Sequence, residues 1–410
     1  MHTNVYTDAA VAALAAARPL LVDVVPAREV VPHLMAGGAC HAGPPIASAD
    51  MCGPMRAALG VALALEGVAA TPAAALALAD AGAVPLLPNH DAGGVAPMSG
   101  VVTGSMPVLV AVDRASGTRA WCPLNEGSGK VLRYGADDAE VVERLRWMHR
   151  VLGRSLARAL TRTGPLDLIE LQRSALAAGD ELHHHTHAAT RLMHRALDRH
   201  LPGPVSAFIA GNHQFFLNVA MVAAKTATAA ASGVPGSRLV TVIARNGVEV
   251  GVKLSGTGDT WFTGPAAAPD PARLEPGYAP ADMQRDLGDS AIVEVYGLGA
   301  LAVEASPASA PSVGLDPADA PAIQARLRRI AAAEHPLMGW LTADGQPVPA
   351  ILGVDAGAVV RERIQPPIHT GIAHREPGVG QIGGGVTLPP IEAFEAAVAV
   401  LEQTAVPAFA

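Results

Sequence analysis

The chain has 410 residues, of which 50% are hydrophobic and 16% charged, and its formal net charge is −8. The length predicts two or three domains with substantial cores. The negative charge and the lack of any basic run in the sequence argue against nucleic acid and anionic membranes as partners. Few cysteines, and no basic segment before an apolar core at the N-terminus, predict a cytoplasmic protein. The uncharged run at residues 92–112 is interrupted by Gly and Pro, so it predicts buried loops around a short strand rather than a membrane span.

The first third of the chain alternates between helix and strand patterns. An Ala-rich stretch at residues 8–18 predicts a helix with Thr7 as its N-cap and Pro19 as its stop. The apolar run at residues 20–25 predicts a buried strand. The remaining predicted elements are helices at residues 53–66 and 72–81 and strands at residues 83–87 and 107–113. We therefore expect an N-terminal α/β lobe over residues 1–138.

The middle third is rich in helical patterns. Apolar residues between Val141 and Leu160 recur every three or four positions and predict an amphipathic helix. Further helices are predicted over about residues 167–197 and 214–231, the latter closed by Gly233. These patterns indicate a mainly helical domain over residues 139–234.

The last third turns to strands. Runs at residues 238–245 and 248–254 flank Asn246-Gly247, which is a strong β-hairpin signal. Residues 317–334 predict a helix with Asp316 as its N-cap, and residues 391–404 predict a terminal helix. We expect a C-terminal α+β lobe over residues 235–410 that contains a Gly-rich loop. The predicted fold class for the whole chain is α/β, in the mixed α+β sense.

Two Gly- and Pro-rich turns in the first lobe carry histidine. His41 begins the sequence HAGPP, and His90 lies in PNHDAGG. A loop histidine could polarise a carbonyl group or act as a base, so we treat both as candidate catalytic residues. A plain surface turn is the alternative for His41, and His90 and Asp91 could point apart.

The sequence NEGSGK, residues 125–130, is similar to a phosphate-binding loop. It combines Gly residues with a hydroxyl group and Lys130. It is not a Walker A motif, because the first glycine is misplaced and no Ser or Thr follows the lysine. We expect Asn125, Glu126 and Lys130 to bind an anion, with an ordinary turn into a helix or strand as the alternative.

The sequence GDELHHHTH, residues 179–187, concentrates two carboxylates and four histidines in a helical pattern. Helical spacing would place Asp180, His183, His184 and His187 on one face. We expect Asp180, Glu181 and His183 to take catalytic roles. Such a cluster could instead bind zinc, or form a solvated helix face; no HExxH motif is present, and we predict no metal.

Two later segments are typical of anion binding. Arg245 and Asn246 at the hairpin turn, followed by Asp289, could clamp a carboxylate or phosphate. The Gly-rich stretch at residues 369–385 is costly for packing unless backbone must approach a ligand closely. Its candidate binding residues are His369, Thr370, His374, Arg375, Gly383 and Gly384.

These segments together resemble the YlbE-like family. The resemblance is carried by HAGPP at His41, NEGSGKVLRYG at Asn125, GDELH at Gly179, QFFLN at Gln214 and GQIGGG at Gly380, and it spans nearly the whole chain. One departure concerns His185-Thr186, where the family tends to have Arg-Asn. If that Arg binds the substrate carboxylate, this chain has a different acceptor.

The resemblance implies a subunit of oxamate carbamoyltransferase, which transfers a carbamoyl group between carbamoyl phosphate and oxamate in allantoin breakdown. It also implies partners: an FdrA-like subunit, similar to succinyl-CoA synthetase, and a small third subunit. We predict small anionic substrates, no cofactor and an oligomer. Two alternatives stay open, a non-catalytic scaffold for the FdrA-like subunit and a metal-dependent amide hydrolase that uses the histidine cluster.

Overall fold

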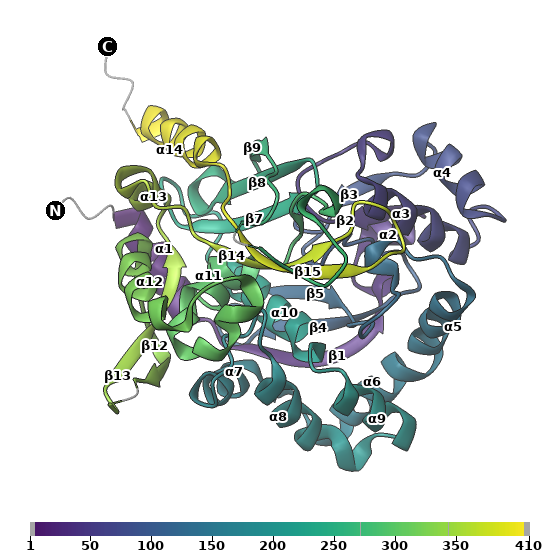
Figure 1. Cartoon of the computed structure of the whole chain (residues 1–410), viewed down its shortest axis with the longest axis horizontal. Coiled ribbons are helices and arrows are strands. Elements are labelled where there is room, and N and C mark those ends of the chain that lie inside the picture. Colours follow the sequence, from purple (N-terminus) through teal and green to yellow (C-terminus); the bar gives the residue numbers. More distant parts are fainter. Residues whose placement is uncertain (1–4, 271, 343, 406–410) are drawn as a thin grey trace.

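A computed structural model describes residues 5–270, 272–342 and 344–405 (Figure 1). Its central layer is an antiparallel sheet with the strand order β5-β4-β1-β6. These strands are β1 (Pro19–Pro26), β4 (Pro107–Asp113), β5 (Arg119–Pro123) and β6 (Leu166–Asp167). Helices and several small sheets pack around this layer, so the predicted α/β, mixed α+β, class is confirmed.

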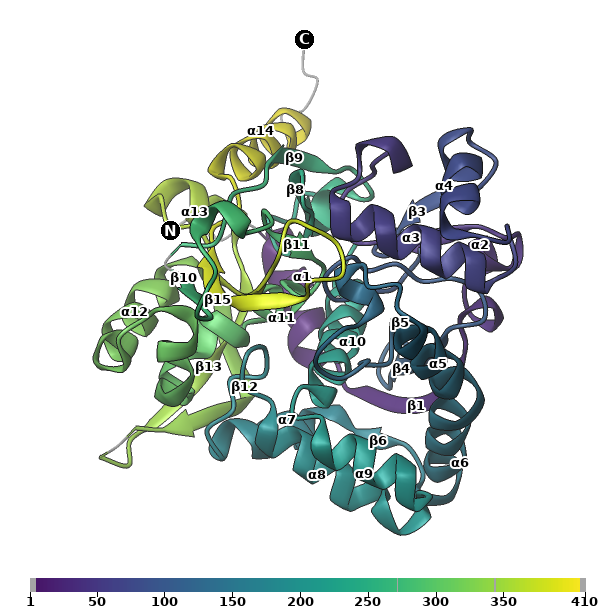
Figure 2. The ribbon, with the colours of Figure 1, turned by 45° about the vertical axis from the view of Figure 1, so that its right-hand side comes forward.

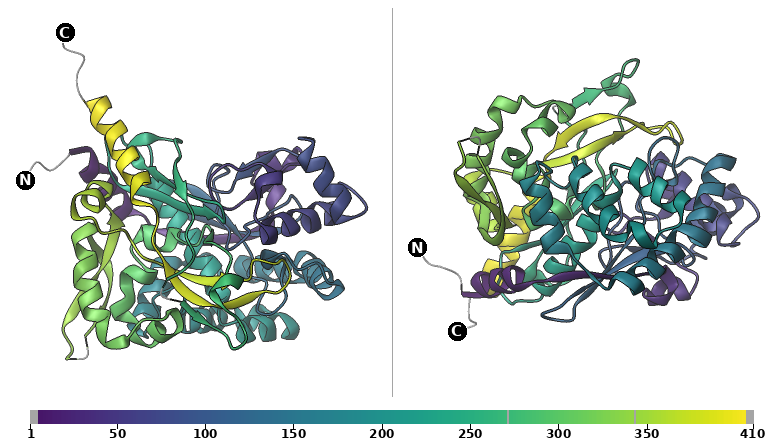
Figure 3. Two further views of the ribbon diagram at one scale, coloured as in Figure 1. Left: turned by 45° about the horizontal axis from the view of Figure 1, so that its top comes forward. Right: turned by 90° about the horizontal axis from the view of Figure 1, so that it is seen from below.

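The N-terminal helices and a short parallel strand pair form a separate projection in Figure 3. Its elements are α2 (Pro32–Met35), β2 (Ala39–His41), α3 (Gly53–Leu65), α4 (Pro72–Asp80) and β3 (Leu86–Pro88). Helix α1 (Val5–Ala16) begins before Thr7. The prediction of Thr7 as an N-cap is therefore wrong, because the residue lies inside the first turn.

The middle of the chain is helical, as expected. The predicted stripe from Val141 to Leu160 is confirmed as one rod, since a π-helical turn at Met148–Leu152 joins α5 to α6. The elements are α5 (Ala139–Trp147), α6 (Gly153–Thr163), α7 (Leu168–Ala177), α8 (His187–Leu197), α9 (Gly203–Gly211) and α10 (Phe215–Ala230).

The continuous helix predicted over residues 167–197 is wrong. Helix α7 ends at Ala177 and α8 begins at His187, with non-helical backbone between them. Gly179 (φ +91°) and Leu182 (φ +76°) occupy left-handed conformations that a helix does not contain. The histidine cluster therefore lies on a turn.

Strands dominate the last third. The predicted hairpin around Asn246-Gly247 is confirmed, with Arg245 opposite Val250. It belongs to a sheet of order β11-β7-β8-β9, formed by β7 (Val240–Asn246), β8 (Glu249–Leu254), β9 (Phe262–Pro265) and β11 (Leu287–Gly288). The other elements are β10 (Ala272–Leu274), α11 (Ile292–Tyr296), α12 (Ala320–Leu327), β12 (Ala331–Leu341), β13 (Pro347–Val354), α13 (Ala356–Glu362), β14 (Ile368–Ala373), β15 (Gln381–Thr387) and α14 (Ile391–Ala405).

Two predictions in this region need correction. The helix expected over residues 317–334 stops at Ile330, because Ala331 begins the long strand that pairs with β13. The expected Gly-rich loop is mostly a hairpin of β14 and β15, with only residues 374–380 outside the strands. Gly383 and Gly384 are strand residues that face Arg273 and Leu274 of β10 across the sheet.

One large apolar core contains side chains from each of the three predicted segments, from Ala10 to Leu401. Helix α10 crosses its middle, and most of its residues are buried (Figure 1). The boundaries at residues 138 and 234 stay a prediction. Among the described residues, no single helix is long and apolar enough to cross a membrane; α9 and α10 would qualify only as a pair, and they are bent by 80°.

A fully buried ion pair links the β11-β7-β8-β9 sheet to the hairpin of β14 and β15. Arg245 Nε lies 2.8 Å from Asp286 Oδ2, and its Nη1 donates to the Gly288 carbonyl at 2.6 Å. Asp286 also accepts hydrogen bonds from the hydroxyls of Thr370 on β14 and Thr387 on β15. The pair thus fixes the β14–β15 hairpin against β7.

We expect the substitution Arg245→Met to destabilise the protein by about 3–5 kcal/mol, because it leaves Asp286 buried without its ionic partner. Urea denaturation followed by circular dichroism measures this change. Arg173→Met is the matched control: Arg173 and its partner Glu170 are both more than half exposed, so the loss should stay within about 1 kcal/mol. Equal effects of the two substitutions would contradict the structural role.

Candidate functional site

Segments that lie far apart in the sequence border one cavity of about 840 Å³. Its lining residues come from within residues 127–134, 184–187, 211–214, 273–275 and 379–384, together with Ser312. Figure 2 shows strand β15, which contributes Gln381, Gly383 and Gly384 to the lining. The volume falls in the range of small-molecule sites, about 300–1,000 Å³.

The side chains of Asn125 and Glu126 build the loop that borders this cavity. Glu126 accepts the N–H groups of Leu132 and Arg133 at 2.7 and 3.1 Å. Asn125 accepts from Gly127 N–H at 2.9 Å and donates to side-chain and backbone oxygens of α10 and the residue before it. Neither residue lines the cavity, so their structural part is to hold the loop rather than to contact a ligand.

Arg144 of α5 fixes the orientation of the same loop. Its Nη1 lies 3.4, 3.3 and 3.2 Å from the carbonyl oxygens of Glu126, Ser128 and Lys130. Gly127 and Gly129 have φ values of +87° and +83°. These left-handed conformations allow the carbonyl groups of every second residue to point toward Arg144. Within the described part of the chain, the N–H groups of Ser128, Gly129 and Lys130 donate to no acceptor. Consecutive free N–H groups of this kind form an anion-binding nest.

Cationic side chains surround the nest. Arg133 lines the cavity and donates from Nη2 to the Gly127 carbonyl at 2.6 Å. Lys130 is 57% exposed and pairs with Asp138 at 3.1 Å, so its ammonium group stays close to the cavity mouth. Arg273 of β10 adds a third positive charge to the lining, beside Glu275. The cavity therefore favours a small anion.

The opposite wall is the start of α10. His213 and Gln214 lie directly before its first turn and line the cavity, and their N–H groups donate to no acceptor in the described residues. A helix N-terminus with free N–H groups attracts negative charge. Burial lowers the pKa of His184 to about 4, and burial also lowers the pKa of His187. Both imidazoles in the cavity wall are thus neutral at physiological pH and could accept a proton.

The turn before α8 places His184 in the cavity wall. Asp180 accepts the N–H of Ala189 at 2.8 Å and so caps α8, and burial raises its pKa. Glu181 is fully buried and accepts the N–H groups of His183, His184 and His185. The helical face that the sequence predicts does not exist here.

His183 contacts another carboxylate instead of the cavity. Its Nδ1 lies 2.7 and 2.8 Å from the two oxygens of Glu294. Among the described residues, no group of three or more His, Cys, Asp or Glu side chains could hold a metal ion. The histidine cluster therefore forms no metal site among the described residues, so the structure gives no support to the alternative of a metal-dependent hydrolase.

A second group of predicted site residues lies away from the cavity, in a buried region around Asp289. Asp289 accepts the N–H groups of Gly43 and Ala96 and the amide of Asn89, and burial raises its pKa to about 6. His90 Nε2 lies 3.9 Å from Asp289, and burial holds the pKa of this histidine well below its usual range.

The remaining predicted site residues in this buried region bond to the surrounding protein. His41 is buried, its Nδ1 contacts the carbonyl of Ala42, and burial lowers its pKa. Asn246 bonds the Pro44 carbonyl and the hairpin backbone. Arg245 is fully buried with Asp286, so its guanidinium group is not available to clamp a substrate.

The residues predicted from the Gly-rich stretch separate in space. Gly383 and Gly384 line the cavity, and an added Cβ would collide with the Arg273 and Ser312 carbonyls, so close strand packing explains both glycines. Thr370 bonds Asp286, and His374 accepts the N–H of Glu376, while Arg375 is exposed. None of these last three lines the cavity.

His369 is buried next to Glu181. Its Nδ1 lies 3.6 Å from Glu181 Oε2, an ion-pair distance that is too long for a hydrogen bond. Burial alone would lower the pKa of His369, but the charge of Glu181 raises it. Burial alone would raise the pKa of Glu181, but His369, His183 and the turn N–H groups lower it to about 2.

Sequence reasoning missed several cavity residues. Arg133 lies within NEGSGKVLRYG, and Gln214 begins QFFLN, so both belong to motifs that carried the family resemblance. His213 and Arg273 had no motif of their own, and only the tertiary structure brings them to the cavity. Arg144 lies within the predicted amphipathic helix, but its position in the sequence gave no indication that it contacts the loop.

Glu181→Gln should lower the stability at pH 7 by about 3 kcal/mol. The folded pKa lies below the unfolded value, so the ionised carboxylate stabilises the fold above about pH 4.5 and loses this effect as the pH falls toward 2. Urea unfolding at pH 7 and pH 3.5 measures the difference between wild type and variant, with Glu170→Gln on the surface as the control. A difference that stays constant between these pH values would contradict the assignment.

Comparisons with known proteins place the chain in a family. Residues 84–290 match the family described as oxamate carbamoyltransferase subunit AllG. The chain is 37% identical to Escherichia coli K12 oxamate carbamoyltransferase subunit AllG over 95% of both chains, and 36% identical to uncharacterized protein YahG of that strain over 93% of this chain and 82% of YahG. A crystal structure of a conserved protein of unknown function from Enterococcus faecalis V583 matches with a TM-score of 0.93 and 37% identity over 97% of each chain. The chain therefore belongs to the family of the oxamate carbamoyltransferase subunit AllG, which confirms the resemblance found in the sequence.

Proposed function

We propose that this chain is a carbamoyltransferase subunit that binds carbamoyl phosphate and an oxamate-like acceptor in the 840 Å³ cavity. The observation that carries the proposal is the nest of free N–H groups at residues 128–130 with Arg133 beside it. The similarity to AllG over 95% of the chain supports the carbamoyl chemistry. Transfer to oxamate would give oxalurate and phosphate.

The cavity offers a position for each part of this reaction. The phosphate of the donor is assigned to the nest and Arg133, which neutralise the charge that grows as phosphate leaves. The acceptor carboxylate is assigned to the free N–H groups of His213 and Gln214 at the start of α10. Neutral His184 also lines the cavity, where its backbone carbonyl accepts a hydrogen bond from Gln214 Nε2, and it is the candidate base for the weakly nucleophilic amide nitrogen.

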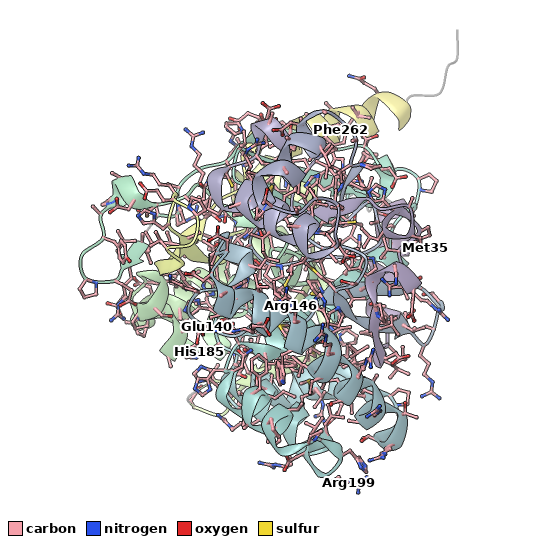
Figure 4. All side chains as sticks on the ribbon, turned by 90° about the vertical axis from the view of Figure 1, so that its right-hand side faces the viewer. Met35, Glu140, Arg146, His185, Arg199 and Phe262 are labelled. Atoms are coloured by element: carbon pink, nitrogen blue, oxygen red, sulfur yellow. The ribbon has the colours of Figure 1, made fainter. Side chains whose placement is uncertain are left out.

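The acceptor end also contains the departure from the family pattern. The hydroxyl of Thr186 donates to the His213 carbonyl at 2.7 Å, so this position helps to set the start of α10. His185 lies between His184 and His187 in a stacked row and is labelled in Figure 4. A carboxylate acceptor other than oxamate is consistent with these contacts, and we propose an oxamate-like compound rather than oxamate alone.

The complete activity is proposed to need an FdrA-like subunit and a small third subunit. A pure scaffold role for this chain makes a different prediction, because a scaffold has no reason to bind substrates. Isothermal titration calorimetry of the purified chain with carbamoyl phosphate, phosphate and oxalurate separates the two. Saturable binding of at least one anion supports the substrate site, and no binding by any of them sinks it in favour of the scaffold.

Arg144→Gln should weaken the binding of phosphate by about tenfold, or about 1.4 kcal/mol, because the loop carbonyls lose their common donor and the nest loses its shape. Calorimetry with inorganic phosphate measures the dissociation constant. Arg146→Gln is the matched control, since Arg146, labelled in Figure 4, lies on the same helix and is exposed, and its ionic partner among the described residues is Glu143. Equal affinities in the two variants would argue against the nest as the phosphate site.

A further inference from the structure

A second cluster of chemically active side chains lies beside the other end of α10. Its central residue is Lys225, which follows Gln214 by eleven positions, a rise of about 16 Å along a helix. Lys253 of β8, His90, Asp91 and Trp261 complete the cluster. None of these residues lines the cavity of the proposed carbamoyl transfer.

The lysine content of the chain makes this cluster unusual. Only three of the 29 Lys and Arg residues are lysines, at Lys130, Lys225 and Lys253. Two of the three are buried together here, with exposed fractions of 7% and 5%. Arginine serves elsewhere as the cation, but it cannot lose its proton in a protein, whereas a buried lysine can.

The surroundings of Lys225 favour the neutral amine. Its Nζ donates one hydrogen bond, to the His90 carbonyl at 3.2 Å, and the described residues provide no carboxylate within bonding distance of it. Burial and the nearby charge of Lys253 lower its pKa to about 8, against smaller opposing effects of Asp91 and Asp289. An amine that is desolvated and adjacent to a second cation is an activated nucleophile.

Two partly exposed side chains, Asp91 and Trp261, border the neighbouring Lys253. Asp91 accepts hydrogen bonds from Lys253 Nζ and from the indole N–H of Trp261, the latter at 3.0 Å. Lys253 Nζ lies 4.5 Å from the centre of the Trp261 ring, so the neighbouring cation has both an ionic and an aromatic partner. Lys253 is thereby engaged by these two partners, which leaves Lys225 as the lysine of the cluster without a carboxylate partner among the described residues.

We propose that the ε-amine of Lys225 is a carbamoyl acceptor, a covalent site separate from the cavity. The neutral amine attacks the carbonyl carbon of carbamoyl phosphate, a C–N bond forms, and the C–O bond to phosphate breaks. The amine proton leaves with the phosphate as hydrogen phosphate, and a neutral urea remains on the side chain. Isocyanic acid would give the same product by addition. The choice of the donor rests on the proposed function, but the reactivity of the amine does not.

Peptide mass spectrometry on the folded wild-type chain tests the site at pH 7.5, with potassium cyanate in one arm and fresh carbamoyl phosphate in the other. We expect Lys225 to gain a carbamoyl group about tenfold faster than Lys130, although Lys130 is 57% exposed, because burial lowers the pKa of Lys225 and so raises the fraction of its neutral amine at this pH. Lys130 is an internal control in the cyanate arm, which needs no bound donor; in the carbamoyl phosphate arm it borders the proposed donor cavity.

The two arms separate this inference from the proposed function. Faster labelling of Lys225 than of Lys130 by cyanate supports the site even if the cavity binds no carbamoyl phosphate. Labelling by carbamoyl phosphate at a rate above that of the cyanate it releases identifies carbamoyl phosphate as the direct donor. Faster labelling of Lys130 than of Lys225 by cyanate, or labelling of Lys225 only after unfolding in guanidinium chloride, overturns the proposal. In Lys225→Met, the rate at Lys130 should be unchanged.

Discussion

The buried ion pair between Arg245 and Asp286 is the interaction on which the arrangement of the C-terminal half depends. Asp286 collects a guanidinium group and two threonine hydroxyls, so one carboxylate links β7, β14 and β15. Because a charge this deeply buried must be fully paired, the three strands cannot shift independently. The same strands carry Gly383 and Gly384 to the cavity wall. The buried ion pair therefore helps to fix the position of that wall.

The cavity itself relies on backbone more than on charged side chains. Glu126 and Asn125 hold the loop from within, and Arg144 holds its carbonyl oxygens from outside. The cavity is lined by residues whose N–H groups donate to no acceptor among the described residues, together with arginine and lysine. Such a preorganised site needs little rearrangement when a phosphate or carboxylate binds, which favours both affinity and stabilisation of developing charge.

Helix α10 relates the cavity to the lysine cluster. The two residues before its first turn, His213 and Gln214, line the anion site, and Lys225 lies near its other end. The residues between them are nearly all buried and apolar, so the helix is a rigid spacer rather than a binding element. The chain therefore has two regions suited to carbamoyl chemistry, one that binds anions and one that presents an amine. They are separated by packed core and can be tested independently.

Local sequence determined the elements whose signals are local. The Asn246-Gly247 hairpin and the helical rod through Val141 and Leu160 follow directly from turn chemistry and apolar spacing, and the motifs identified the family because they span the whole chain. Tertiary structure decided which motif residues meet. By residue type, Asp180 and Glu181 looked catalytic and Arg245 looked anion-binding, yet each is bonded to buried partners that lie far away in the sequence or on an unexpected turn. Conversely, Arg273 and His213 reach the cavity only because β10 pairs with β15 and α10 begins beside the nest. The physical reason is that a charged side chain acquires its role from its burial and its partners, and these are set by contacts between distant segments.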